Sequence, residues 1–282
     1  MLELGRYRLA SVLAGTFALD GGAMFGIVPR PLWEKQAPPD SRNRIRLAAR
    51  CLLAVDAQGP RRILVDDGLG DKWDAKHADI YAIDGRDLDA ELARNGVARQ
   101  DVTDVILTHL HFDHAGGTTR RGPGGRLELA FPNATYHLQR RAWQWAHAPS
   151  ERDAGSFLPE NFEPLQHSNH LHLLDGEAEL FPGFELIVSE GHTVGQQLPR
   201  VHGDGTHLTF CGDVIPTRAH VRVSWVMAYD LQPLTTVEEK KVLLAQALED
   251  DGILFFEHDP EVAACRLGER EGQPIFREAV EL

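Results

Sequence analysis

The sequence predicts an α/β fold with two β-rich halves and helices on the outside, and three observations support this prediction. Short apolar runs of strand length alternate with helix-like segments along the 282 residues. Hydrophobic residues make up 43% of the chain, which is enough for a globular core. No internal repeat or low-complexity segment interrupts the pattern, so we expect a single domain spanning residues 1–282.

The first half predicts a hairpin, a helix and a strand in that order. Residues 45–56 and 61–66 have the composition of strands, and Gly59-Pro60 supplies the turn between them. Residues 87–95 predict a short helix because Leu88 and Leu92 share one face and Gly96 provides a stop signal. Residues 102–108 then form a short apolar strand.

The segment at about residues 120–170 differs in composition from what surrounds it. It begins with Gly122-Pro123-Gly124-Gly125 and contains few apolar residues. We expect an insertion within the domain, with one helix at about 138–147 and loops elsewhere, because it is too poor in apolar residues for its own core.

The second half returns to strands and helices. Residues 184–189 and 206–211 predict strands. Thr236-Val237-Glu238-Glu239 has the pattern of a capping box, which predicts a helix that starts there and ends near Asp251-Gly252. Residues 253–256 follow as a buried strand.

Composition excludes several functional classes. A formal net charge of −13 argues against general nucleic-acid binding and against anionic membrane surfaces. We expect no signal peptide and no membrane span, because no basic and apolar leader and no run of ~18 apolar residues is present. Cys51, Cys211 and Cys265 form no Cys-x-x-Cys pair, which favours a reducing compartment. We therefore expect a cytoplasmic protein.

The histidines indicate chemistry. Four potential metal ligands, His109, His111, Asp113 and His114, directly follow the 102–108 strand and precede Gly116-Gly117. In an extended chain the first three side chains point to one side, and a turn at Asp113 sends His114 elsewhere, so the segment can serve two adjacent metals. Three further candidates each follow an apolar strand: His192, Asp213 and His258.

These seven residues, in this order, resemble the ligand set of the metallo-β-lactamase superfamily of hydrolases. Val65-Asp66-Asp67-Gly68 is similar to the Val-Asp-Thr-Gly element of that superfamily, with Asp67 in place of Thr. The resemblance implies a four-layer αβ/βα sandwich with a dinuclear site between its halves. It assigns one metal to His109, His111 and His192 and the other to Asp113, His114 and His258, with Asp213 as the bridge. Asp66 would orient a ligand histidine.

The ligand types suit Zn²⁺ best, and Fe or Mn also fit. Two divalent ions can share one water and lower its pKa to ~7, which gives a bridging hydroxide that attacks a carbonyl or phosphorus. Asp113 is expected to carry the proton to the leaving group as the catalytic residue.

Residues 19–29 and the segment Trp225–Asp230 are similar to the branch that contains quorum-quenching N-acyl-homoserine lactonases and methyl-parathion-hydrolase-like enzymes. The resemblance implies opening of a lactone or cleavage of an ester in an apolar pocket. Candidate pocket residues are Met24, Phe25, Phe112, Trp143, Trp145, Phe157, Trp225 and Tyr229.

Two departures from that branch concern the site. Pro216 stands where those lactonases carry a tyrosine, and Tyr229 is the candidate to replace it. The His-Thr-Pro-Gly-His element of the branch reads His192-Thr193-Val194-Gly195-Gln196.

The alternatives are an organophosphate (phosphotriester) hydrolase, a glyoxalase-II-like thioesterase, a nuclease or phosphodiesterase, and a non-catalytic metal-binding module. The expected partner is a small-molecule substrate, with no nucleic acid and no membrane. A homodimer is also a hypothesis, because a second subunit could cap the apolar N-terminal loop.

Overall fold

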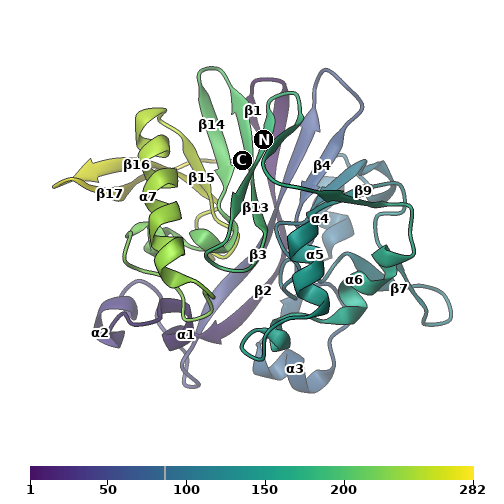
Figure 1. Cartoon of the computed structure of the whole chain (residues 1–282), viewed down its shortest axis with the longest axis horizontal. Helices are drawn as coiled ribbons and strands as arrows, with labels where there is room; N and C mark the ends of the chain where they lie inside the picture. The colour runs from purple at the N-terminus through teal and green to yellow at the C-terminus, as the bar shows by residue number, and fades with distance from the viewer. Residues whose placement is uncertain (86) are drawn as a thin grey trace.

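Two mixed β-sheets face each other in the computed structural model, which describes residues 1–85 and 87–282 (Figure 1). The first sheet runs in the order β1-β2-β3-β4-β6-β9-β10, with β5 paired to β2. Its strands are β1 Leu2–Leu4, β2 Tyr7–Asp20, β3 Arg44–Asp56, β4 Arg62–Val65, β5 Asp84–Gly85, β6 Asp104–Ile106, β9 Thr135–Gln139 and β10 Leu171–Leu174.

The second sheet runs in chain order from β11 to β17. Its strands are β11 Ala178–Phe181, β12 Phe184–Ser189, β13 Gln196–Gly203, β14 Thr206–Phe210, β15 Ile253–Phe255, β16 Ala264–Arg270 and β17 Gln273–Ala279. A separate hairpin pairs β7 Thr119–Arg121 with β8 Leu127–Leu129.

Helices cover the outer faces of both sheets (Figure 1). The helices on these faces are α4 Leu88–Arg94, α5 Arg140–His147, α6 Pro159–Gln166 and α7 Pro233–Glu249, whereas α1 Gly21–Phe25, α2 Arg30–Trp33 and α3 Ala75–Ile80 lie at the lower end of the molecule in Figure 1. The buried faces of α4, α5 and α6 pack on the first sheet, and that of α7 packs on the second. The layers are thus helix, sheet, sheet and helix, which confirms the predicted four-layer αβ/βα sandwich.

The central core lies between the sheets. Side chains alternate across a strand, so one set from each sheet meets in the middle, including Leu9, Leu52, Phe184, Phe210 and Phe255. The opposite set packs under the helices, as Leu243 and Leu244 of α7 do against Leu254 and Cys265. Burying both faces explains why strands such as β3 are almost continuously apolar.

Most predicted elements are present. The structure has strands within 45–56, 61–66, 102–108, 184–189, 206–211 and 253–256, and the helix predicted at 87–95 is α4. Cys51, Cys211 and Cys265 are buried free thiols. In the described part of the chain, no helix is both long enough and apolar enough to cross a bilayer.

The start of α7 differs from the prediction. The helix begins at Pro233, after the N-cap residue Gln232, so Thr236 lies inside the first turn. Its hydroxyl donates to the backbone oxygen of Gln232. Proline at the first helical position decides this start, because its φ is fixed near the helical value and its missing N–H needs no partner there.

Segment 120–170 holds more structure than the one helix and loops predicted for it. The predicted helix is α5, but β9 is a central strand of the first sheet and α6 is a second helix. Tyr136 and Phe162 are fully buried in the core under the helices. These elements were not predicted from the sequence because each is short and is flanked by polar residues.

The N-terminal stretch 19–29 is also different from the exposed apolar loop we expected. Asp20 ends β2 and caps α1 by accepting the backbone N–H of Ala23. Met24 and Phe25 are buried, whereas Ile27 is 94% exposed. The helical turn of α1 directs the side chains of Met24 and Phe25 into the core, so Ile27 is the large apolar residue of this stretch that is exposed to solvent.

Candidate metal centre

The seven candidate ligands come together where four strands end, namely β6, β12, β14 and β15. They form two buried groups, whose ligand atoms lie within 4.8 Å of one another inside each group. The first group contains His109, His111, His192 and Asp213, and the second contains Asp113, His114 and His258.

Asp213 lies between the two groups. Its Oδ2 is 3.1 Å from His192 Nε2, and its Oδ1 is 3.0 Å from His258 Nε2 and 3.5 Å from His114 Nε2. Asp113 lies on the second side, with its oxygens 3.7 Å from His258 Nε2 and 3.9 Å from His114 Nε2. One carboxylate with an oxygen toward each group is the geometry of a bridging ligand.

The backbone from residue 108 to 117 produces this arrangement. The chain turns after His111, whose carbonyl accepts the N–H groups of His114 and Ala115. Gly116 and Gly117 follow because a Cβ there would stand 2.3 Å from the carbonyl oxygens of Leu69 and Asp67. Only glycine permits the loop to pack this closely against the segment after β4.

Buried hydrogen-bond acceptors contact the Nδ1 atoms of two ligand histidines, on the side of the ring that faces away from the cluster. His192 Nδ1 is 2.9 Å from Asp230 Oδ1, and His258 Nδ1 is 2.8 Å from the backbone oxygen of Ala48. Partners of this kind fix the tautomer of a ligand histidine and leave the other ring nitrogen free for a metal.

The prediction placed Asp66 in such a role, and the structure brings it to His114. Its Oδ2 is 3.0 Å from His114 Nδ1 and accepts the hydroxyl of Thr108, while its Oδ1 accepts the backbone N–H of Thr108 at 2.6 Å. Asp66 itself has a positive φ of 54°, a conformation that aspartate tolerates better than most residues.

Sequence reasoning missed two acidic residues at the site, Asp230 and Glu257. Asp230 lies in the loop just before α7, between β14 and β15 of the second sheet, 38 residues from His192 along the chain. Glu257 is fully buried, and its Oε2 lies 2.9 Å from His114 Nδ1. Its position directly before His258 was a signal, but a strand-end acid is also an ordinary turn residue.

Burial and neighbouring charges shift the pKa values in two directions. Burial, reinforced by the other histidines, lowers the pKa of His109 and His111 well below the usual value, so both imidazoles are neutral. Burial also opposes charge on His258, but Asp213 outweighs it and raises the pKa of His258 to about 9. Burial would raise the pKa of Asp213, yet His192, His258 and His114 together hold it well below its usual value.

The donor set fits divalent metal ions. His109 Nε2 is a buried ring nitrogen with no hydrogen-bond partner among the described residues. His111 Nδ1 and His192 Nε2 approach to 3.2 Å, as do His114 Nε2 and His258 Nε2. Ring nitrogens that face each other at this distance direct their lone pairs to one point once they are deprotonated, and a cation held there is stabilised by them.

A cavity of about 350 Å³ opens onto these groups. Of the predicted pocket residues, Met24, Phe112 and Tyr229 line it, together with His111, Asp113, His192, Asp213 and His258. Tyr229 thus reaches the site. Pro216 instead accepts the backbone N–H of His258 through its carbonyl oxygen at 3.0 Å. The cavity wall also includes Leu19, Tyr81, Arg152 and Met227, which the sequence did not indicate.

The other predicted pocket residues pack elsewhere, and the described cavity wall does not include them. Phe25 stacks on Trp33 and His220, and Trp143 packs on Phe162. Trp145 donates to Asp153, Phe157 packs behind His111, and Trp225 lines a neighbouring groove. These residues were predicted to line the pocket because their side chains are large and apolar, but the same properties favour burial in the core.

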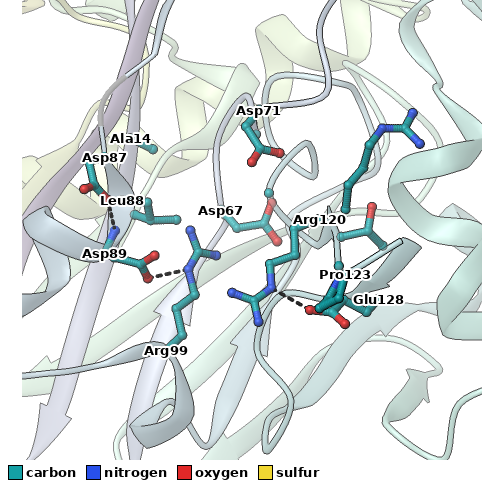
Figure 2. Close-up of a pocket in the computed structure, with 15 residues that line it drawn as sticks. Ala14, Asp67, Asp71, Asp87, Leu88, Asp89, Arg99, Arg120, Pro123 and Glu128 are labelled. Atoms are coloured by element: carbon teal, nitrogen blue, oxygen red, sulfur yellow. Dashed lines mark hydrogen bonds and ion pairs between the residues drawn. The ribbon is translucent and has the colours of Figure 1, made fainter. Parts of the chain in front are cut away.

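A second cavity, of about 500 Å³, lies behind the metal-binding loop (Figure 2). Its charged side chains pair with one another: Arg99 with Asp89, and Arg120 with Glu128 (Figure 2). The buried Asp67 carboxylate at this cavity accepts the Thr118 hydroxyl, and burial raises its pKa to about 7. Arg121, which also lines this cavity, pairs with Glu160 outside it.

The fold is that of a metallo-hydrolase, and the paired His/Asp groups are consistent with a dimetal site. Residues 55–258 match the family model described as the metallo-beta-lactamase superfamily, and the chain belongs to this superfamily.

Two relatives extend the comparison. A probable metallo-hydrolase of Mycobacterium tuberculosis is 25% identical over 276 residues, which covers 85% of this chain and 86% of the relative. An N-acyl homoserine lactonase of Bacillus cereus is 28% identical over 170 residues, covering 55% of this chain and 58% of the lactonase.

Two solved structures show the same fold. A probable metal-dependent hydrolase from Staphylococcus aureus superposes with a TM-score of 0.89 at 29% identity, covering 99% of this chain and 100% of that one. The dizinc quorum-quenching lactonase AidC, solved with the product N-hexanoyl-L-homoserine, gives a TM-score of 0.81 at 18% identity, covering 100% and 97%.

Proposed function

We propose that the protein is a dizinc hydrolase that opens lactones or cleaves esters, with N-acyl-homoserine-lactone-like molecules as its substrates. The observation that carries the proposal is Asp213, shared by two ligand groups at the floor of a cavity that also has apolar walls. The sequence likeness to the Bacillus cereus lactonase supports the substrate class.

The seven candidate ligands would hold the ions as the resemblance assigns them, with Asp213 between. When bound, two divalent ions lower the pKa of water and polarise the oxygen of the scissile carbonyl. Zinc suits the imidazole and carboxylate donors, and iron or manganese are outcomes that metal analysis can reveal.

The protein's own side chains supply positioning and proton transfer. Asp113 lies on the cavity wall beside His258 and is the group we assign to carry the proton to the leaving oxygen. Tyr229, which also lines the cavity, remains a neutral phenol because burial raises its pKa, reinforced by the charge of Asp113. Its hydroxyl can therefore donate a hydrogen bond to the substrate.

A substrate panel tests the proposal. Zinc-loaded protein is assayed with acyl-homoserine lactones, phosphotriesters, thioesters and phosphodiesters at equal concentrations. We expect the lactones to give the highest kcat/KM. Phosphotriester turnover alone would move the assignment to the organophosphate hydrolases, and phosphodiester turnover alone would move it to the nucleases.

The assembly and the compartment are proposals as well. The exposed Ile27 beside the site favours a homodimer, which sedimentation velocity tests directly. The three buried free thiols support a cytoplasmic location, to be checked by cell fractionation.

A further inference from the structure

Two histidines face each other at the edge of the first sheet, and neither is among the seven candidate ligands. His137 of β9 and His172 of β10 are register partners on adjacent strands, which lie about 4.8 Å apart in a sheet. Their Nδ1 atoms are 3.0 Å apart. In the metal centre, His111 Nδ1 and His192 Nε2 have a similar separation of 3.2 Å. The pair therefore repeats, in another part of the fold, the close approach of ring nitrogens found in the metal centre.

Asp104 decides which nitrogen of His137 carries the proton. Its Oδ1 is 2.9 Å from His137 Nε2, while its Oδ2 accepts hydrogen bonds from Thr103 Oγ1 and from Arg61, at 2.7 Å and 3.0 Å. Burial would raise the pKa of Asp104, but the hydrogen bonds from His137 and Thr103 outweigh it and lower the pKa. Asp104 is therefore an ionised acceptor that keeps a proton on Nε2. In the neutral ring of His137 the lone pair lies on Nδ1, the atom that faces His172.

The second histidine gives an ion access to the pair. His137 is only 4% exposed, whereas His172 is exposed to solvent. β10 is the last strand in the order of the first sheet, so His172 lies on an edge strand. Partial burial, reinforced by the nearby His137, lowers the pKa of His172. The ring of His172 is therefore neutral at neutral pH and can offer a lone pair to a cation.

We propose that His137 and His172 form a further metal site, which binds Zn²⁺ or a similar divalent ion such as Ni²⁺ or Cu²⁺ through the two Nδ1 atoms. Imidazole nitrogen is a donor that suits these ions. Zn–N bonds of about 2.0–2.1 Å in a tetrahedral arrangement place two ligand nitrogens about 3.3 Å apart, so the rings need to separate only slightly. On binding, His172 carries its proton on Nε2.

Asp104 supports this site in the way that Asp230 supports His192. In both cases a buried carboxylate contacts the ring nitrogen that does not face the ion, which orients a ligand histidine. Water completes the coordination, and with two protein ligands this site binds zinc more weakly than the dinuclear centre. The bound ion links the edge strand β10 to β9, so it stabilises the folded state.

Zinc uptake at increasing free concentration tests the site. Wild-type protein and His172→Ala are dialysed against zinc at neutral pH, and bound metal is measured by elemental analysis. At high free zinc we expect the wild-type chain to bind about one ion more than the variant, and at low free zinc the same amount. Uptake at low free zinc reports on the dinuclear centre, so the two sites succeed or fail separately. His172→Ala is chosen because it leaves the buried contact between Asp104 and His137 in place.

His202→Ala is the matched control. His202 is also an exposed histidine on a strand, but its Nε2 pairs with the carboxylate of Glu185. We expect His202→Ala to keep the extra ion. Equal zinc uptake by the wild type and His172→Ala would overturn the site, and an equal loss in both variants would show only scattered binding to surface histidines and would overturn it as well.

Nitrogen NMR of the imidazole rings identifies the ligands directly. As the extra ion binds, the Nδ1 resonances of both His137 and His172 should shift. His137 Nε2 should keep the chemical shift of a protonated nitrogen, because Asp104 accepts its hydrogen bond. Shifts confined to other histidines would contradict the proposal.

Discussion

The metal cavity and the cavity of Figure 2 border the same stretch of chain, the first at His111 to Asp113 and the second at Gly117 and Thr119. Both are rich in charged side chains, and the second is the larger, at about 500 Å³ against about 350 Å³. In the second cavity, acids and arginines neutralise one another in pairs such as Arg120 with Glu128. At the metal cavity, the seven candidate ligands form two groups, and the ligand atoms within each group lie close enough together to bind one ion.

This difference shows that volume and charge content do not identify a site. A metal site is better identified by ligand atoms that converge on one point while the other ring nitrogen of each histidine is already hydrogen-bonded, as His192 Nδ1 is to Asp230. The following predictions test the contrast between the two cavities, from the largest expected effect to the smallest.

Removing a ligand should abolish catalysis. His109→Ala takes away a neutral imidazole from the first group, and we expect a loss in kcat/KM well beyond the ~100-fold typical of an outer partner. Activity on the best substrate of the panel, with metal content measured in parallel, checks this. Full activity in His109→Ala would contradict the assignment.

Metal affinity should depend steeply on pH. Because the pKa of His258 is raised to about 9 in the metal-free protein, a proton must leave before this nitrogen can bind a metal. Affinity should therefore rise by about tenfold or more per pH unit from neutral pH towards pH 9, because the pKa values of His114 and His192 are raised as well. Competition with a chelator at fixed pH values measures it, and a flat profile would be inconsistent with His258 as a ligand.

Loss of an outer partner should have an intermediate effect. Asp230→Ala frees the His192 ring to rotate, and we expect metal affinity to fall about 10-fold to 100-fold. Chelator competition against the wild type measures the change. Unchanged affinity would show that the surrounding packing alone orients His192.

The smallest effect should come from the second cavity. Arg120→Ala breaks an exposed ion pair with Glu128, so the free energy of unfolding should change by less than about 1 kcal/mol. Metal content and kcat/KM should stay within about twofold of the wild type. A large loss of activity would mean that the two cavities are coupled through the shared loop.

The residue pattern predicted two β-rich halves with outer helices, and the four layers came from the resemblance to the superfamily, whereas the candidate ligands were found for a physical reason. The ligands come after apolar strands of both sheets, and because the two sheets face each other, these strand ends meet at one end of the sandwich. The roles of Asp230 and Glu257 were not predicted, because no local sequence pattern shows that an acidic residue will contact a histidine far away in the chain. The cavity wall was predicted only in part, because the sequence does not distinguish an apolar residue of the core from one that faces the cavity. Trp143 packs on Phe162, whereas Met227 lines the cavity, and the tertiary packing of α5 and of the 222–230 loop determines this difference.

The metal stoichiometry of the purified chain tests the central claim most directly. Wild-type protein and Asp213→Asn are dialysed against zinc, and bound metal is measured by elemental analysis. We predict about two ions per wild-type chain and fewer in the variant, because Asp213 faces both groups. A wild-type chain that binds no metal, or a variant that binds the same two ions equally tightly, would contradict a dinuclear centre built around Asp213.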